Sequence, residues 1–136
     1  MSIFIDTPAF IAVLNADDAH HPKAQDLWNS LLASGEPLIT SNYVLLETIS
    51  VAQRRLGMGA VRAFYADGSP VLDVVWVTES VHEAAEVSLL VAGRRDLSLV
   101  DCTSFELMRR RGLTRAFTFD PHFADQGFEC LPGSKE

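Results

Sequence analysis

The chain has 136 residues, of which 48% are hydrophobic and 21% are charged, and its formal net charge is -7. This length and composition predict one globular domain over residues 1–136 and exclude a disordered chain. No apolar run is long enough to cross a membrane and no signal peptide pattern opens the chain, so we expect a cytoplasmic protein. The negative charge, taken alone, argues against broad nonspecific binding of nucleic acid, although acids that hold cations would weaken that argument.

Apolar runs rich in β-branched residues predict strands, and apolar residues at helical spacing between capping residues predict helices. In chain order we expect a strand at 2–6, a helix opened by Thr7 and Pro8 over 9–14, and a helix from Asp18 to Gly35. A strand at 37–40, a helix from Ser41 to Gly57, a short helix at 60–66 and a strand at 71–77 are expected next. The chain should then form a helix ending at Gly93, a helix from Ser98 to Gly112, a strand at 115–119 and an edge strand at 128–131.

Strands that alternate with helices pair in parallel, with helices on both faces of the sheet. We therefore expect an α/β fold, a three-layer α/β/α sandwich around a mainly parallel central sheet of four to five strands. In such sheets a functional site lies beyond the carboxyl ends of the strands.

Four carboxylates are expected to meet at that edge of the sheet. Asp6 and Asp120 stand where strands end, Glu47 lies in the second turn of the helix after the second strand, and Asp101 lies in the first turn of the helix that Ser98 begins. Each also has a structural explanation. Asp6 suits the positive end of a helix, Asp101 completes a capping box with Ser98, Glu47 suits a solvated helix face and Asp120 suits a turn before proline.

The argument for a site rests on the four acids as a set. Clustered carboxylates repel one another unless a cation lies between them, and an all-oxygen cluster suits Mg²⁺ or Mn²⁺. Such ions lower the pKa of water and offset charge on a phosphodiester during attack in line with the leaving group. This chemistry predicts a divalent-metal-dependent phosphodiesterase with Asp6, Glu47, Asp101 and Asp120 as both metal ligands and catalytic residues.

Two further residues are weaker candidates for the same site. Thr118 precedes Asp120 by two positions and would point to the same face of its strand, where its hydroxyl would orient a water or serve as an ordinary strand threonine. Asp125 would supply an outer carboxylate or be a solvated loop acid. His122 is close to Asp120 in the chain, and we interpret it as a loop residue and not as a ligand.

With these acids in this order, the sequence resembles PIN-domain ribonucleases, and most of all the VapC-type toxins of toxin–antitoxin modules. The resemblance runs through FIDTPAFIAVLNADDAHHPKA, SNYVLLE, DLSLVDCTSFELMRRRGL and AFTFDPHFADQGF. It implies a single PIN-like domain over residues 1–136 and an endoribonuclease that cleaves RNA with Mg²⁺ or Mn²⁺ at Asp6, Glu47, Asp101 and Asp120. It also implies a homodimer and a cognate antitoxin whose C-terminal segment lies over the active site. Pro8 stands where serine is more usual in the family, and proline suits a first helical turn.

Basic residues would contact the RNA phosphates, and the candidates are Arg54, Arg55, Arg94 and Arg95. For the first pair the structural alternative is that they offset the negative end of a helix. Alternative functions are a housekeeping RNA-processing PIN nuclease and a catalytically silent PIN-like domain that binds protein or RNA. A further alternative is an unrelated doubly wound domain whose acids only cap helices and turns, which predicts no dependence on divalent ions.

Overall fold

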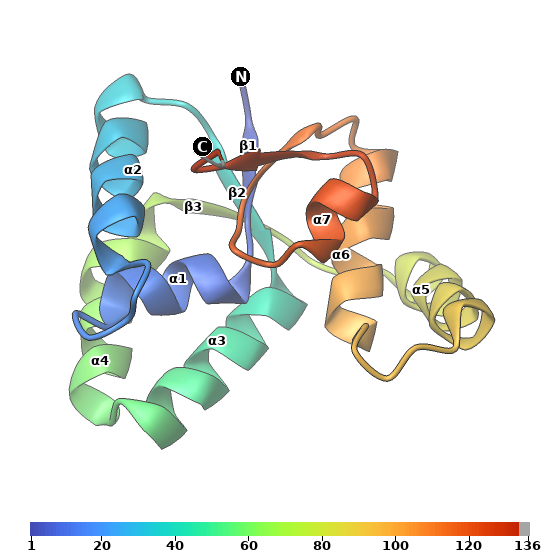
Figure 1. Ribbon diagram of the computed structural model, residues 1–136, viewed down its shortest axis with the longest axis horizontal. Helices are drawn as coiled ribbons and strands as arrows, with labels where there is room; N and C mark the ends of the chain where they lie inside the picture. The colour runs from blue at the N-terminus through green and yellow to red at the C-terminus, as the bar shows by residue number, and fades with distance from the viewer. Residues whose placement is uncertain (134–136) are drawn as a thin grey trace.

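Five short apolar segments pair as one parallel sheet in the order β3-β2-β1-β4-β5. The structure is a computed structural model, which describes residues 1–133 (Figure 1). Its strands are β1 (Ile3–Ile5), β2 (Leu38–Ser41), β3 (Leu72–Val75), β4 (Arg115–Phe117) and β5 (Glu129–Leu131). The predicted parallel sheet is thus confirmed, and the last strand lies at an edge of it as expected.

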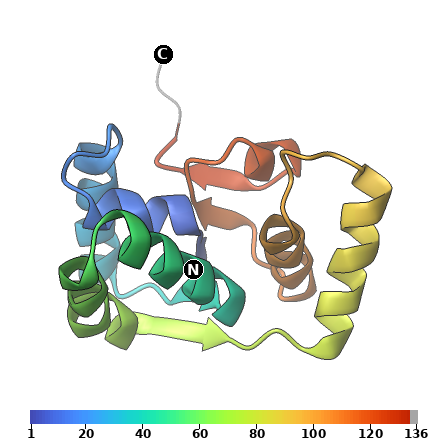
Figure 2. The same cartoon turned by 90° about the horizontal axis from the view of Figure 1, so that it is seen from below.

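Helices connect the strands and enclose the sheet. They are α1 (Thr7–Leu14), α2 (His21–Ser34), α3 (Asn42–Arg55), α4 (Met58–Ala63), the π-helical turn η1 (Phe64–Gly68), the 3-10 turn η2 (Ser69–Val71), α5 (Glu79–Ala92), α6 (Leu99–Arg110) and α7 (His122–Asp125). Helices α1, α2 and α4 lie on one side of the sheet and α6 and α7 on the other, with α5 packed outside α6 (Figures 1 and 2). This arrangement confirms the three-layer α/β/α sandwich.

The central strands carry the core. Every residue of β1 is fully buried, and Phe117 of β4 and Phe123 of α7 are also fully buried. Thr40 is a polar exception inside the sheet, and its hydroxyl donates a hydrogen bond to the carbonyl oxygen of Ile5 at 2.9 Å. Burying large apolar side chains on both faces of the central strands stabilises the fold. This packing also fixes the position of the strands and therefore of their carboxyl ends.

Most predicted helix starts and stops are confirmed. The hydroxyls of Ser41 and Ser98 accept hydrogen bonds from the backbone N–H groups of Val44 and Asp101, and Gly35 and Gly93 end their helices in the left-handed conformation.

The prediction that Asp18 caps the second helix is wrong, because α2 begins at His21. The Asp18 carboxylate instead accepts the backbone N–H of His20 at 2.8 Å, so it orders the turn before the helix. The strands predicted at 71–77 and 115–119 are shorter than expected. Beyond β3, Trp76 is 72% exposed, and beyond β4 the chain turns into the site.

Within residues 1–133, none of the helices combines the length and the apolar character needed to span a lipid bilayer.

Candidate active site

The four predicted carboxylates line one pocket at the carboxyl ends of the central strands. Asp6 follows β1, Glu47 lies on α3, Asp101 lies in the first turn of α6 and Asp120 follows β4, and all four border a hollow of about 360 Å³. Strands β1 and β4 are neighbours, and the backbone N–H of Asp6 donates to the carbonyl oxygen of Phe117 at 3.2 Å. Parallel pairing therefore places the two strand-end acids side by side.

Asp6 is the most deeply placed of the four acids. Its residue is 1% exposed, and one carboxylate oxygen accepts the hydroxyl of Thr118 at 3.3 Å. Burial is the main cause that raises the pKa of Asp6 to about 8. A backbone hydrogen bond at Thr7 lowers this pKa, and the charges of Asp101, Glu47 and Asp120 raise it further. At neutral pH the Asp6 carboxyl is therefore mostly protonated when no cation is bound.

Asp101 serves a structural and an electrostatic role together. Its side chain accepts the backbone N–H of Ser98 at 3.2 Å, and its own N–H donates to the Ser98 hydroxyl at 3.0 Å, which completes the predicted capping box. Burial is the main cause that raises the pKa of Asp101, and the charges of Asp120 and Glu47 add to it, while the bonds with Ser98 oppose it. The capping explanation is correct, and the same carboxylate also borders the pocket.

Thr118 ties the two strand-end acids together. It lies just beyond β4 and is 3% exposed. Its hydroxyl donates to Asp6 and accepts the backbone N–H of Asp120 at 3.0 Å. The side chain therefore fixes the orientation of the Asp6 carboxyl and the turn that carries Asp120.

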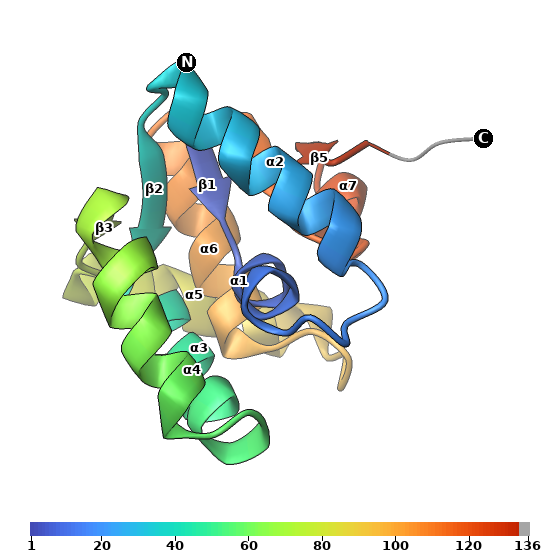
Figure 3. The ribbon, with the colours of Figure 1, turned by 90° about the vertical axis from the view of Figure 1, so that its left-hand side faces the viewer.

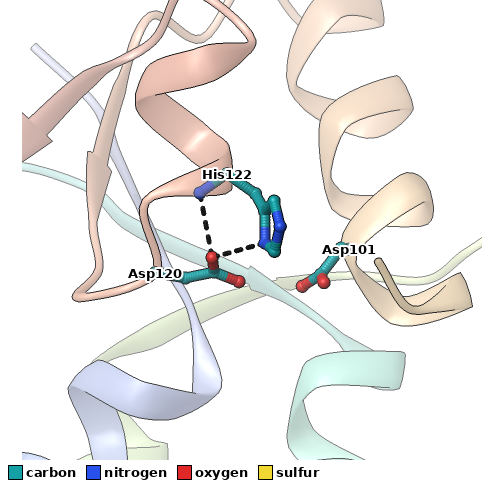
Figure 4. Close-up of side chains that lie close together, drawn as sticks. All are labelled: Asp101, Asp120 and His122. Carbon is teal, nitrogen blue, oxygen red and sulfur yellow. Dashed lines mark hydrogen bonds and ion pairs between the residues drawn. The ribbon is translucent and has the colours of Figure 1, made fainter. Parts of the chain in front are cut away.

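His122 contacts Asp120, and the interpretation of this histidine as a simple loop residue is wrong. Its backbone N–H donates to the Asp120 carboxylate at 2.9 Å, and its ring Nδ1 lies 2.7 Å from the same oxygen (Figure 4). The ring Nε2 lies 3.3 Å from an oxygen of Asp96. Burial lowers the pKa of His122, but the hydrogen bond to Asp96 and the charge of Asp120 outweigh it, so the pKa is raised overall.

Figure 4 shows the carboxylates of Asp101 and Asp120 pointing toward one another beside the ring of His122. One potential ligand atom from each of the three lies within 4.8 Å of the others, at a spacing that suits a metal ion. The Asp-x-His spacing was the sequence signal for this contact. It was weak, because only the turn that starts α7 brings the ring back onto Asp120.

The remaining candidates divide into one that reaches the pocket and four that do not. Arg55 lines the pocket from the end of α3. Arg54 and Arg95 are exposed and do not border it, and Arg94 forms an ion pair with Asp96 at 2.8 Å. Asp125 is exposed on α7 and does not line the pocket. Asp18, His20 and Phe119 also line the pocket, although they were not proposed as site residues.

The donor set fits a hard divalent cation. The pocket collects four carboxylates, and the buried Asp6 has no cationic side chain bonded to it among residues 1–133. Oxygen-rich sets of this kind select Mg²⁺ or Mn²⁺ over metals that prefer thiolate ligands. Burial is the main cause of the raised pKa of Asp6 and of Asp101, and a dication would offset the mutual repulsion of the acids that adds to it.

Comparison with known proteins identifies a family and related proteins that match most of this chain. Residues 3–129 match the family described as PIN domain. The chain is 41% identical over 128 residues to the 23S rRNA-specific endonuclease VapC20 of Mycobacterium tuberculosis, in strains CDC 1551 / Oshkosh and H37Rv, and the match covers 93% of this chain and 95% of the relative.

Solved structures share the fold. The crystal structure of M. tuberculosis VapC20, described as a sarcin–ricin loop cleaving toxin, superposes with a TM-score of 0.80 at 40% identity over 93% of this chain and 95% of that one. VapBC2 from Rickettsia felis, bound to a DNA fragment from its promoter, gives a TM-score of 0.67 at 12% identity over 96% of this chain and 97% of that one. FitAcB from Neisseria gonorrhoeae gives 0.66 at 12% identity over 96% of each chain.

Proposed function

This chain belongs to the PIN domain family, and from that premise we propose that it is a divalent-metal-dependent endoribonuclease, the toxin of a toxin–antitoxin module. The observation that carries the proposal is the convergence of Asp6, Glu47, Asp101 and Asp120 on one pocket at the carboxyl ends of the strands. The 41% identity to VapC20 over 93% of the chain supports an RNA substrate, and we propose the sarcin–ricin loop of 23S rRNA. Such a substrate would place the protein in the cytoplasm.

We assign the four acids to holding Mg²⁺ or Mn²⁺. When bound, the ion supplies a lowered pKa for an attacking water and positive charge beside the phosphate. The protein contributes a fixed frame for this chemistry. The hydroxyl of Thr118 orients Asp6, the Ser98 capping box holds Asp101 in place, and His122 orients Asp120.

Arg55 is the RNA contact that the geometry favours among the four predicted arginines. It lies on the rim of the acidic pocket and is exposed, so it can meet a phosphate next to the cleaved bond. Arg94 forms an ion pair with Asp96, and Arg54 and Arg95 are exposed residues that do not line the pocket. We keep these three as outer contacts at most, and we assign Asp125 no part in the metal site.

We propose two protein partners. A cognate antitoxin would present a basic residue to the four acids, because a cationic side chain offsets the same repulsion that a metal ion does. A second copy of the chain would cover the outer face of α5, where Val87, Leu90 and Val91 are 61%, 80% and 81% exposed. Removing such a row of apolar side chains from water favours association.

The test is cleavage of a stem-loop RNA that carries the sarcin–ricin sequence, with Mg²⁺, with Mn²⁺ and with EDTA. Asp101→Asn is the informative variant, because asparagine keeps much of the capping geometry with Ser98 while it removes the charge from the pocket. Asp26→Asn is the matched control, since Asp26 is an exposed acid on α2 outside the pocket. We expect a divalent-dependent cut by the wild type and the control and none by Asp101→Asn.

Cleavage that persists in EDTA or in Asp101→Asn would contradict the metal mechanism at this pocket. A folded protein that binds the stem-loop without cutting it under any of these conditions would favour the catalytically silent domain. Cleavage of many unrelated RNAs, with the stem-loop cut no faster than the others, would favour a nuclease with a general processing role.

A further inference from the structure

A second hollow continues the acidic pocket toward the start of α2. It has a volume of about 340 Å³, and its lining includes His20, Lys23, Phe119 and Asp120. His20, Phe119 and Asp120 line both hollows, so the two hollows adjoin at these residues, which we call the junction, and the two hollows together are called the groove. The volume of this second hollow is within the ~300–1,000 Å³ typical of small-ligand pockets.

The junction is built from two stacked rings. The imidazole of His20 lies on the phenyl ring of Phe119 with 4.2 Å between centroids and 9° between the planes. The lower ring is fixed, because Phe119 packs edge-on against the fully buried Phe117 at 6.2 Å. His20 itself is exposed, although Phe119 covers one face of its ring.

The backbone also holds His20 firmly. Its N–H donates to the Asp18 carboxylate at 2.8 Å, and its carbonyl oxygen accepts the N–H of Ala24 at 2.9 Å. The side chain makes no capping hydrogen bond to α2, so the ring does not serve as the cap of this helix. Beside the ring, Lys23 brings a positive charge into the second hollow, where Asp120 is the sole acid among the lining residues.

We propose that His20 and Phe119 form a stacking platform for one unpaired base of the RNA, next to the cleaved bond, with Lys23 contacting a neighbouring phosphate. This subsite rests on the proposed ribonuclease function and adds a determinant of substrate choice to it. Unpaired RNA bases are recognised by stacking on aromatic side chains, histidine included, and the contact tolerates different bases. The exposed imidazole of His20, which lines the same hollow as the four acids proposed to hold the metal ion, suits a base that is turned out of a loop.

The distribution of charges over the two hollows supports an RNA path and not a peptide. Arg55 lines the hollow that holds the four acids, and Lys23 lines the other hollow. A phosphate backbone that crosses both hollows would meet a basic side chain in each. The platform borders both hollows, where a base attached to that backbone would project.

The first test measures KM and kcat on the sarcin–ricin stem-loop for His20→Ala, His20→Leu, His20→Phe and Lys23→Ala. We expect KM to rise about tenfold in His20→Ala and His20→Leu, and His20→Phe to restore it, because stacking needs a flat ring and not mere bulk. Lys23→Ala should raise KM by a smaller factor that shrinks at high salt. His82→Ala and Arg62→Ala are the matched controls, since both residues lie outside the groove.

The second test does not depend on cleavage. Loop bases are replaced one at a time by 2-aminopurine, and fluorescence is followed as Asp101→Asn protein binds the RNA. The platform is supported if fluorescence at one position is quenched by the Asp101→Asn protein. This quenching should be lost when His20→Ala is added to Asp101→Asn and kept when His20→Phe is added instead. The absence of a quenched position, or a His20→Leu variant equal to wild type in KM, would overturn it. A wild type that fails to cut while the quenching is seen would reject the nuclease assignment and leave the base subsite standing.

Discussion

Replacing Asp6 by asparagine should stabilise the metal-free protein while it removes activity. In the folded state the Asp6 pKa is raised to about 8 from its ordinary value of 3.8, mainly by burial. Between these two values the folded state keeps a proton that the unfolded state releases, so the free energy of unfolding falls as the pH rises. Asparagine resembles the protonated acid, can accept the Thr118 hydroxyl and does not lose a side-chain cap, because Asp6 makes none.

The magnitude follows from the two pKa values. Each pH unit inside the window lowers the stability of the wild type by at most ~1.4 kcal/mol. At pH 7 the accumulated effect is on the order of 4 kcal/mol, and between pH 5 and pH 7 it grows by about 2–3 kcal/mol. A protein of this size with a total stability of roughly 5–15 kcal/mol would show such a change clearly. The raised pKa values of Asp101 and His122 act in the same direction, but both proteins keep those groups.

The assay is urea unfolding in EDTA at pH 5 and pH 7 for the wild type, Asp6→Asn and the exposed control Asp26→Asn. We expect the stability advantage of Asp6→Asn to increase by about 2–3 kcal/mol from pH 5 to pH 7, with no such trend for the control. Adding Mg²⁺ or Mn²⁺ should stabilise the wild type more than Asp6→Asn, because binding favours the ionised carboxylate. An Asp6→Asn protein that is less stable than wild type at pH 7, with an equal pH slope, would refute the reasoning.

Three further substitutions test other parts of the structure. His122→Asn should lower cleavage and apparent Mn²⁺ affinity by roughly 10–100-fold, because Asp120 loses its orienting ring; a metal titration of activity with His82→Asn as control measures this. Ser104→Ala should raise the free energy of unfolding by about 0.5–1 kcal/mol in urea, since the Ser104 hydroxyl is buried with no hydrogen-bond partner within residues 1–133 and alanine suits a helix better. Leu90→Glu should turn a dimer into a monomer in light scattering, and an unchanged mass would place the second copy elsewhere.

The order of strands and helices was predictable because local signals agreed with the fold. Ser41 and Ser98 sit before apolar stripes, and Gly35 and Gly93 end theirs, so capping chemistry marked the boundaries without tertiary information. The convergence of the four acids was predictable for a related reason. Parallel strands end at one edge, so acids at strand ends and early helical turns meet there whatever the details of packing.

The parts of the site that depend on loops could not be predicted in this way. The contact between His122 and Asp120 needs the turn that opens α7, and the stacking of His20 on Phe119 joins the start of α2 to the chain beyond β4. The colours of Figure 3 show that these segments are far apart in the sequence, since α2 is blue and α7 is red. The prediction that Asp18 caps the second helix failed for the same reason, because its carboxylate accepts a hydrogen bond within a turn that only the folded loop defines.

Asp6 and Asp101 differ in how strongly each argues for function. The Ser98 capping box gives Asp101 a sufficient structural reason to be where it is, so its place in the pocket adds limited weight. Asp6 stands at the start of α1 without a capping hydrogen bond, and it is buried where ionisation is opposed by the fold and by three other acids. A helix start would be served as well by an exposed residue, and at no cost in stability above pH 5. The fold therefore bears a penalty for ionising Asp6 that a bound cation would relieve, and that penalty, more than the capping box, supports the proposed metal centre.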